Sequence, residues 1–204
     1  MEIQLENFEI WIRKLFATEL KPEICYHNLD HTVSIVKRVG ELANHYQLPK
    51  RDQIDLFLAG WLHDIGYWDG NPVEHEAQGA EMAGEFLGQF GIDPVRIERI
   101  QSAILATKIP QQPKDLFESI LCDSDLYHLS KDDWFDQTLL LKKEREKISG
   151  KVVELLPFLK LSREFVSNHR YHTDFAQTQL EPQKQINLAK LESMIYQLEY
   201  LVHA

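Results

Sequence analysis

Residues 54–66, IDLFLAGWLHDIG, combine a strongly apolar segment with a histidine and an aspartate at its end. The apolar side chains recur at intervals of three and four: Ile54, Phe57, Leu58, Trp61 and Leu62. This period predicts a helix with a buried face. The next two residues are His63 and Asp64. Adjacent helical side chains point about 100° apart, but at a helix end both can converge on one ion.

The same helical period extends over most of the chain, and no run of alternating β-branched residues predicts a strand. Proline and glycine separate the segments: Leu48-Pro49 precedes the third helix, and Gly66, Gly70, Asn71 and Pro72 end it. Asp93-Pro94 is typical of a helix start, and Ser130 with Asp133 resembles a capping box. We expect helices at about 8–16, 32–46, 54–62, 74–90, 94–105, 117–126, 130–148, 152–169 and 182–201.

These segments predict an all-α protein of one domain, residues 1–204, with no repeat or low-complexity linker. Of the 204 residues, 44% are hydrophobic and 26% are charged, which excludes a disordered or fibrous chain. The formal net charge of -10 repels nucleic-acid backbone and acidic lipid. We therefore expect neither a nucleic acid nor a membrane as a partner.

The compartment is predicted from the cysteines and from the absence of long apolar runs. Cys25 and Cys122 are too few for a disulfide framework, and neither belongs to a CxxC pair. No uninterrupted apolar stretch approaches the roughly 20 residues of a membrane span, and the first residues do not resemble a signal peptide. The sequence thus predicts a cytoplasmic, unprocessed protein.

Two further elements carry groups that bind metals. His31 lies on the same helical stripe as Ile35 and Val39, although a histidine on an apolar face is more often a core residue. In 120–126, ILCDSDL, two carboxylates interrupt an apolar segment, and buried carboxylates require a metal or a basic partner. Two imidazoles and two carboxylates from three helices suit a divalent transition metal.

The order of these residues resembles the HD-domain superfamily of metal-dependent phosphohydrolases. The resemblance covers about 25–130 and rests on YHNLDHT (26–32), GWLHDIGY (60–67) and LCDSDL (121–126). The segment 131–204, with RYHT at 170–173, is similar to the C-terminal part of a predicted metal-dependent phosphohydrolase subgroup, and forms additional helices. The resemblance implies an HD-type helical bundle and a reaction class, without a substrate.

The resemblance also implies roles for individual residues. The ligands of one divalent ion, Mn, Fe, Co, Ni, Zn or Mg, are then His31, His63, Asp64 and Asp125. Asp123 is the rival of Asp125, which is favoured because the family's last ligand usually precedes an apolar residue. The alternative is open at this point.

Residues outside this ligand set are candidates for catalysis and substrate binding. Asp64 is expected to orient the attacking water and His75 to protonate the leaving oxygen, unless His75 only faces solvent at a helix start. Lys108 could neutralise a phosphate, or be a solvated lysine at a helix end. His27 could reach the same face from one turn before His31, or belong to a helix-start network.

A second metal is not expected. Some relatives bind it through two further histidines, of which His75 matches the first, but Thr107 stands where the second would fall. This departure argues against a di-iron oxygenase. A nucleotide-sensing module without turnover is the other alternative.

The expected substrate is a small soluble phosphoester, most simply a nucleotide, with Trp68 beside Tyr67 as a wall for the base. Lys142 and Arg145 are predicted on a solvated face. His169 and His172 are candidates for closing the pocket and not for binding metal. A homodimer is left open.

Overall fold

The structure, a computed structural model, describes residues 5–68 and 72–203 and has no β-strand in that part of the chain. The all-α prediction is confirmed. The chain forms two compact units, the first ending at Asp125 and the second beginning at Leu126. A single domain over 1–204 stays a prediction. Gly70 and Asn71, predicted to end the third helix, lie outside the described residues.

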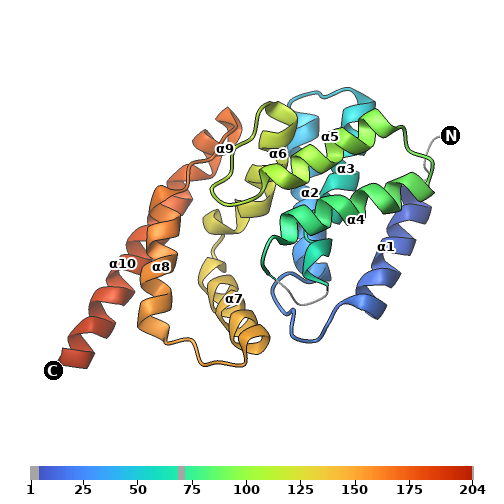
Figure 1. The fold of residues 1–204 in the computed structure, drawn as a ribbon. Coiled ribbons are helices and arrows are strands. Elements are labelled where there is room, and N and C mark those ends of the chain that lie inside the picture. The colour runs from blue at the N-terminus through green and yellow to red at the C-terminus, as the bar shows by residue number, and fades with distance from the viewer. Residues whose placement is uncertain (1–4, 69–71, 204) are drawn as a thin grey trace. The chain divides into compact units, whose positions relative to one another are not determined.

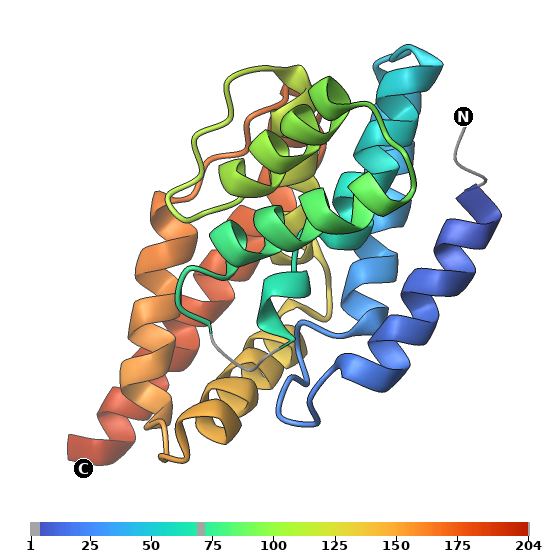
Figure 2. The ribbon, with the colours of Figure 1, turned by 45° about the vertical axis from the view of Figure 1, so that its right-hand side comes forward.

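The first unit is a bundle of helices that surrounds α3 (Figure 1). α2 packs against α3 and α6, while α4 packs against α5 and against the short 3-10 helix η1 (Figure 2). Its elements are α1 Leu5–Glu19, α2 Leu29–His45, α3 Lys50–Leu62, η1 Ile65–Tyr67, α4 His75–Gln89, α5 Pro94–Ala106 and α6 Leu116–Asp125.

α3 is more completely buried than its apolar period predicted. Leu56, Leu58 and Leu62 are fully buried, whereas Ile54 and Phe57, which belong to the predicted stripe, are only half-buried. The difference arises because α2, α4, α5 and α6 all contact α3. A helix enclosed in this way has no single apolar face.

Several helix ends match their sequence signals, and one does not. The Asp93 side chain accepts a hydrogen bond from the backbone N–H of Val95, and Pro94 is the first residue of α5, as predicted. The capping box at Ser130 and Asp133 is wrong. Ser130 ends the 3-10 helix η2, Leu126–Ser130, and donates its hydroxyl to the Tyr127 carbonyl, so it is too early to cap α7.

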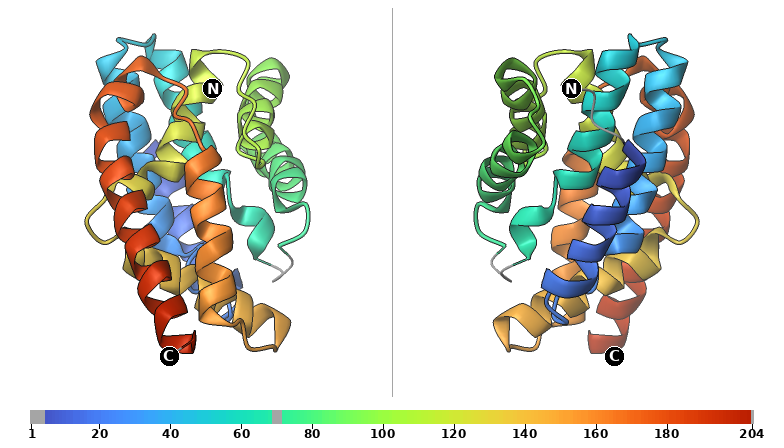
Figure 3. Two further views of the ribbon diagram at one scale, coloured as in Figure 1. Left: turned by 90° about the vertical axis from the view of Figure 1, so that its left-hand side faces the viewer. Right: turned by 90° about the vertical axis from the view of Figure 1, so that its right-hand side faces the viewer.

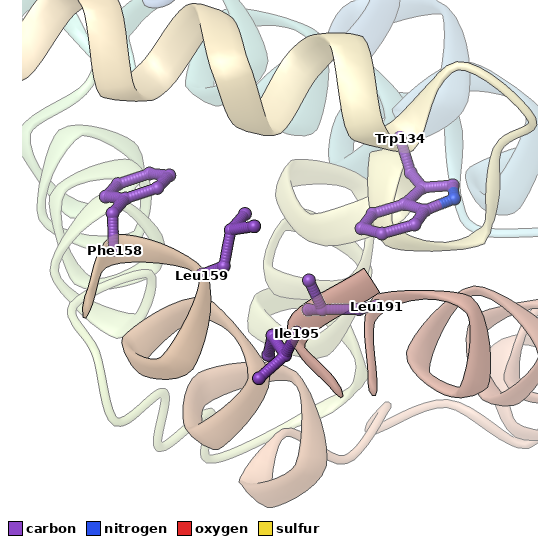
Figure 4. Close-up of a cluster of buried hydrophobic side chains, with 5 residues drawn as sticks. All are labelled: Trp134, Phe158, Leu159, Leu191 and Ile195. Carbon is purple, nitrogen blue, oxygen red and sulfur yellow. The ribbon is translucent and has the colours of Figure 1, made fainter. Parts of the chain in front are cut away.

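The second unit is built on the packing of α10 against α8 (Figure 3). Its helices are η2, α7 Trp134–Ser149, α8 Leu155–Asn168, α9 Asp174–Gln179 and α10 Glu181–His203. A buried apolar cluster joins α7, α8 and α10 (Figure 4): Trp134, Phe158, Leu159, Leu191 and Ile195.

One further boundary and one whole helix in this unit differ from expectation. α8 begins three residues later than predicted, at Leu155, and Val152 is exposed. The six-residue α9 was not predicted, because a helix this short contains too few turns to show a period. Its one local signal is Thr173, whose hydroxyl oxygen accepts a hydrogen bond from the backbone N–H of Ala176.

No helix in the described part of the chain is long and apolar enough to pass through a bilayer. Both cysteines are free thiols, and the thiol of Cys122 donates to the Ala106 carbonyl. The cytoplasmic location stays a prediction.

Two ion pairs, one turn apart on α3, connect this helix to α5. Because one is buried and the other is partly exposed, we expect their removal to lower the stability of the protein by different amounts. The carboxylate of Asp55 is buried and accepts from Arg96 Nε at 2.8 Å, whereas Asp52 is partly exposed and accepts from Arg99 at 2.7 Å. We expect Asp55→Ala to lower the free energy of unfolding by about 3 kcal/mol, because it leaves a guanidinium without its partner. Asp52→Ala, the matched control, should cost less than about 1 kcal/mol. Urea unfolding measures both, and equal losses would contradict this interpretation.

Candidate metal centre

The N-terminus of α2 holds His31 in place. The Asn28 side chain caps this helix: its Oδ1 accepts from the His31 N–H at 3.0 Å, and its Nδ2 donates to the Cys25 carbonyl at 2.7 Å. His31 therefore lies in the first turn, with its side chain 8% exposed. The sequence predicted a helix-start network here, and Asn28 is its centre.

The end of α3 presents His63 in a defined tautomer. The His63 ring is fully buried, and its Nδ1 lies 2.8 Å from the Gly60 carbonyl oxygen. A carbonyl can only accept, so Nδ1 carries a proton, and in the neutral ring, the form that binds a metal, Nε2 keeps its lone pair. A backbone carbonyl on one ring nitrogen is a common way to orient a metal-binding histidine.

The turn after Asp64 is fixed by close backbone packing on α4. A Cβ atom added to Gly66 would lie 2.0 Å from the His75 carbonyl oxygen and 2.8 Å from the Gly79 nitrogen. Gly66 was predicted to end a helix, but it lies inside η1, and what requires glycine there is this close approach. The same contact brings the start of α4, with His75, next to Asp64.

Four side chains from α2, the end of α3 and α6 converge. Asp64 Oδ2 lies 3.4 Å from His31 Nε2 and 3.0 Å from His63 Nε2, and Asp125 Oδ1 lies 3.7 Å from each of these nitrogens. One potential ligand atom from each residue lies within 4.8 Å of all the others. Among the described residues no other His, Cys, Asp or Glu group meets this criterion.

The atoms that face one another in this cluster suit a cation. His31 Nε2, His63 Nε2 and Asp64 Oδ2 are buried and make no hydrogen bond of good geometry, although Asp64 Oδ2 lies 3.0 Å from His63 Nε2. Buried polar atoms are rarely left in this state, because an unmade interaction costs free energy. Two imidazole nitrogens and two carboxylates are ligands for a divalent transition metal, so the residues fit such an ion.

The pKa values of the four cluster residues also indicate that the cluster requires positive charge. Burial alone would lower the pKa of His63, but the carboxylates of Asp64 and Asp125 outweigh it and hold this pKa well above its usual value. The pKa of His31 is also raised, against burial, by Asp125 and Asp64. Conversely, burial would raise the pKa values of Asp64 and Asp125, but the imidazoles lower both. Without a metal, protons therefore supply the positive charge.

Of the two carboxylates between which the sequence could not choose, only one belongs to the cluster. Asp125, the last residue of α6, belongs to the cluster of four. Asp123 is completely buried and lies outside it. Two positions along a helix turn the side chain by about 200°, which is why only one of the pair reaches the cluster.

The two histidines proposed for other roles lie beside Asp64. His75 Nε2 is 3.9 Å from Asp64 Oδ1, and the side chain is 16% exposed, so His75 does not simply face solvent. The Tyr67 ring lies between His75 and His27, with ring centroids 4.0 Å and 3.8 Å apart. The sequence gave Tyr67 no such role, because nothing local predicts that three rings stack.

The remaining candidates lie elsewhere. Lys108 is exposed and lines a cavity of about 340 Å³ together with Lys114 and Glu118, and none of the four cluster residues lines that cavity. Its role in substrate binding stays a prediction. Trp68 packs against Phe16 and is 6% exposed, which leaves little of its ring for a nucleobase.

Four basic or titratable candidates lie in the second unit, and of these His172 is half-buried. Lys142 forms an ion pair with Glu146, and the Arg145 guanidinium lies over the Phe158 ring. His169 is buried and bonded within its own unit.

Comparison with known proteins identifies the family to which this chain belongs. The model of the HD domain family matches residues 28–130, about half of the chain, and this chain belongs to that family. The crystal structure of a predicted HD superfamily hydrolase from an uncultured Thermotogales bacterium is similar in fold, with a TM-score of 0.59 and 18% identity. The match covers 97% of this chain and 99% of the other. None of the curated proteins matches this sequence.

The contrast between Asp125 and Asp123 tests the ligand assignment. We expect Asp125→Ala to weaken binding of Mn²⁺ or Co²⁺ by well over tenfold, because at most three protein ligands would remain. Asp123→Asn, the matched control two residues away, should keep one equivalent of metal. Elemental analysis after dialysis measures both. Retained metal in Asp125→Ala with loss in Asp123→Asn would reverse the assignment.

Metal affinity should also depend on pH in a defined direction. Since the pKa values of His31 and His63 are raised in the metal-free protein, both rings hold protons at pH values where a free histidine is already neutral. A metal must displace these protons, so affinity should rise with pH by up to about two decades per unit and level off above the raised pKa values. Competition with a chelator between about pH 6 and 9 measures this, and a flat profile would contradict it.

Proposed function

We propose that the protein is a metal-dependent phosphohydrolase that cleaves a phosphoester of a small soluble substrate, most simply a nucleotide. The observation that carries the proposal is the largely buried cluster of His31, His63, Asp64 and Asp125, with three facing atoms that make no hydrogen bond of good geometry. Membership of the HD domain family, and the hydrolase name of the structural relative, support the same reaction class.

The four residues would hold one divalent ion, and the chemistry it supplies is a water of lowered pKa together with positive charge beside a phosphoryl oxygen. Asp64 is suited to a second task. Its Oδ2 faces the two cluster imidazoles, while its Oδ1 faces His75 at 3.9 Å. This carboxylate can therefore orient a water between the cluster and His75.

His75 is the group best placed to protonate the leaving oxygen. Its Nδ1 lies 3.2 Å from the Pro72 carbonyl oxygen, so Nδ1 donates there, and a proton available to a substrate is then on Nε2 of the imidazolium. Nε2 is also the nitrogen that faces Asp64. The Tyr67 ring packs against both His75 and His27, and the centroids of the two imidazoles are 6.3 Å apart. We propose that His27 contacts a phosphoryl oxygen of the same substrate.

The expected size of the substrate follows from charge. A net charge of -10 repels a long polyanion outside the site, so we propose a small ester and not DNA or RNA.

The sequence indicates two alternative functions. A di-iron oxygenase needs a second set of ligands, and Thr107 offers none: its hydroxyl donates to the Ile104 carbonyl. A nucleotide sensor without turnover is the alternative that an activity measurement must address.

The activity itself is the test. We expect hydrolysis of at least one phosphoester in a panel of nucleotides and small esters with Mn²⁺, Co²⁺, Ni²⁺ or Mg²⁺. His75→Gln should lower kcat by about 10²- to 10⁴-fold through loss of the acid, with metal content unchanged. His45→Gln, an exposed histidine of α2, is the control. Tight nucleotide binding without turnover in the metal-loaded protein would instead establish the sensor.

A further inference from the structure

The second unit contains a buried lysine that the proposed function does not use. Lys184 of α10 is completely buried. Its ammonium donates to the His169 carbonyl at 2.7 Å, forms an ion pair with Glu181 at 2.9 Å, and lies 3.3 Å from His169 Nδ1. These three partners account for the three N–H groups of an ammonium, so the charged form of the lysine is fully bonded. Burial lowers the pKa of Lys184, and the neighbouring Glu181 carboxylate opposes this shift.

This arrangement fixes the tautomer of His169. An ammonium group has no lone pair, so His169 Nδ1 must accept from Lys184, and the proton of the neutral ring lies on Nε2. Nε2 is buried and has no hydrogen-bond partner, in a side chain that is 9% exposed. His169 is thus a buried N–H donor without an acceptor, a state that folded proteins rarely leave unresolved.

Two cations contact the other polar atoms of His169, its carbonyl oxygen and its Nδ1. Arg170 Nη1 donates to the same His169 carbonyl at 3.0 Å and to the Ser167 carbonyl at 2.8 Å, so two cations lie against one residue, while Glu181 balances one of them. Burial first, and then the charges of Lys184, His172 and others, lower the pKa of His169 to about 3. The ring therefore remains neutral, and what it lacks is an acceptor that carries negative charge.

We propose that the second unit binds an oxyanion of the phosphate class at His169, with Nε2–H as the donor and with Arg170 and Lys184 supplying the electrostatic attraction. Charge-assisted hydrogen bonds to such an oxygen are stronger than bonds to a neutral acceptor. The site consists only of residues of the second unit, and its argument does not depend on the metal cluster or on the proposed phosphohydrolase activity.

Two isosteric variants test the donor. In His169→Asn the amide oxygen can replace Nδ1 as the acceptor for Lys184, but no group replaces Nε2–H. In His169→Gln the amide nitrogen can replace Nε2–H. We expect inorganic phosphate to bind the wild type and His169→Gln, and to bind His169→Asn at least about tenfold more weakly. Calorimetric titration of the full chain measures this, with His45→Asn as a matched control.

The titrations are made on chelator-treated protein, so that phosphate cannot bind through a metal, and are repeated with a nucleoside monophosphate. Equal affinity for both ligands assigns recognition to the phosphate group, and tighter binding of the nucleotide places that group in a larger ligand site. Absence of phosphate binding to the wild type at about 10 mM, or unchanged affinity in His169→Asn, overturns the proposal. If His169→Asn does not fold, the Nε2 nitrogen resonance of the wild type decides, because phosphate must shift it.

Discussion

The burial of two carboxylates against two imidazoles is the constraint on which the first unit depends. Asp64 and Asp125 lie among apolar helices, where an ionised carboxylate without a partner costs several kcal/mol. His31 and His63 can offset this charge only as imidazolium or by sharing a cation with the carboxylates. This need for positive charge raises the pKa values of both histidines. It also explains why the buried cluster atoms that face one another lack good hydrogen bonds.

Such an arrangement persists only if the surrounding backbone cannot relax. The Asn28 cap fixes the first turn of α2, and the Gly60 carbonyl fixes the ring of His63. Direct backbone contact at Gly66 ties the turn after Asp64 to α4. Each of these contacts lies within a few residues of a cluster side chain, so contacts at the helix ends help to fix the potential ligands.

The second unit resolves its buried charge differently. There the Lys184 ammonium is fully bonded, and the polar atom without a hydrogen-bond partner is His169 Nε2. In both units the informative atoms are polar, buried and without a partner, because apolar packing alone would not place them there.

The sequence alone determined the helical class, most helix limits and three of the four cluster residues, because buried periodicity, helix signals such as Asp93-Pro94 and the motifs around His31 and His63-Asp64 are local. Tertiary structure decided what local patterns do not encode. The choice between Asp125 and Asp123 depends on which side of α6 faces α2, and the requirement for glycine at Gly66 depends on the approach of α4. The ring stack at Tyr67 likewise needs residues that are distant along the chain, and so only the packed helices bring it together.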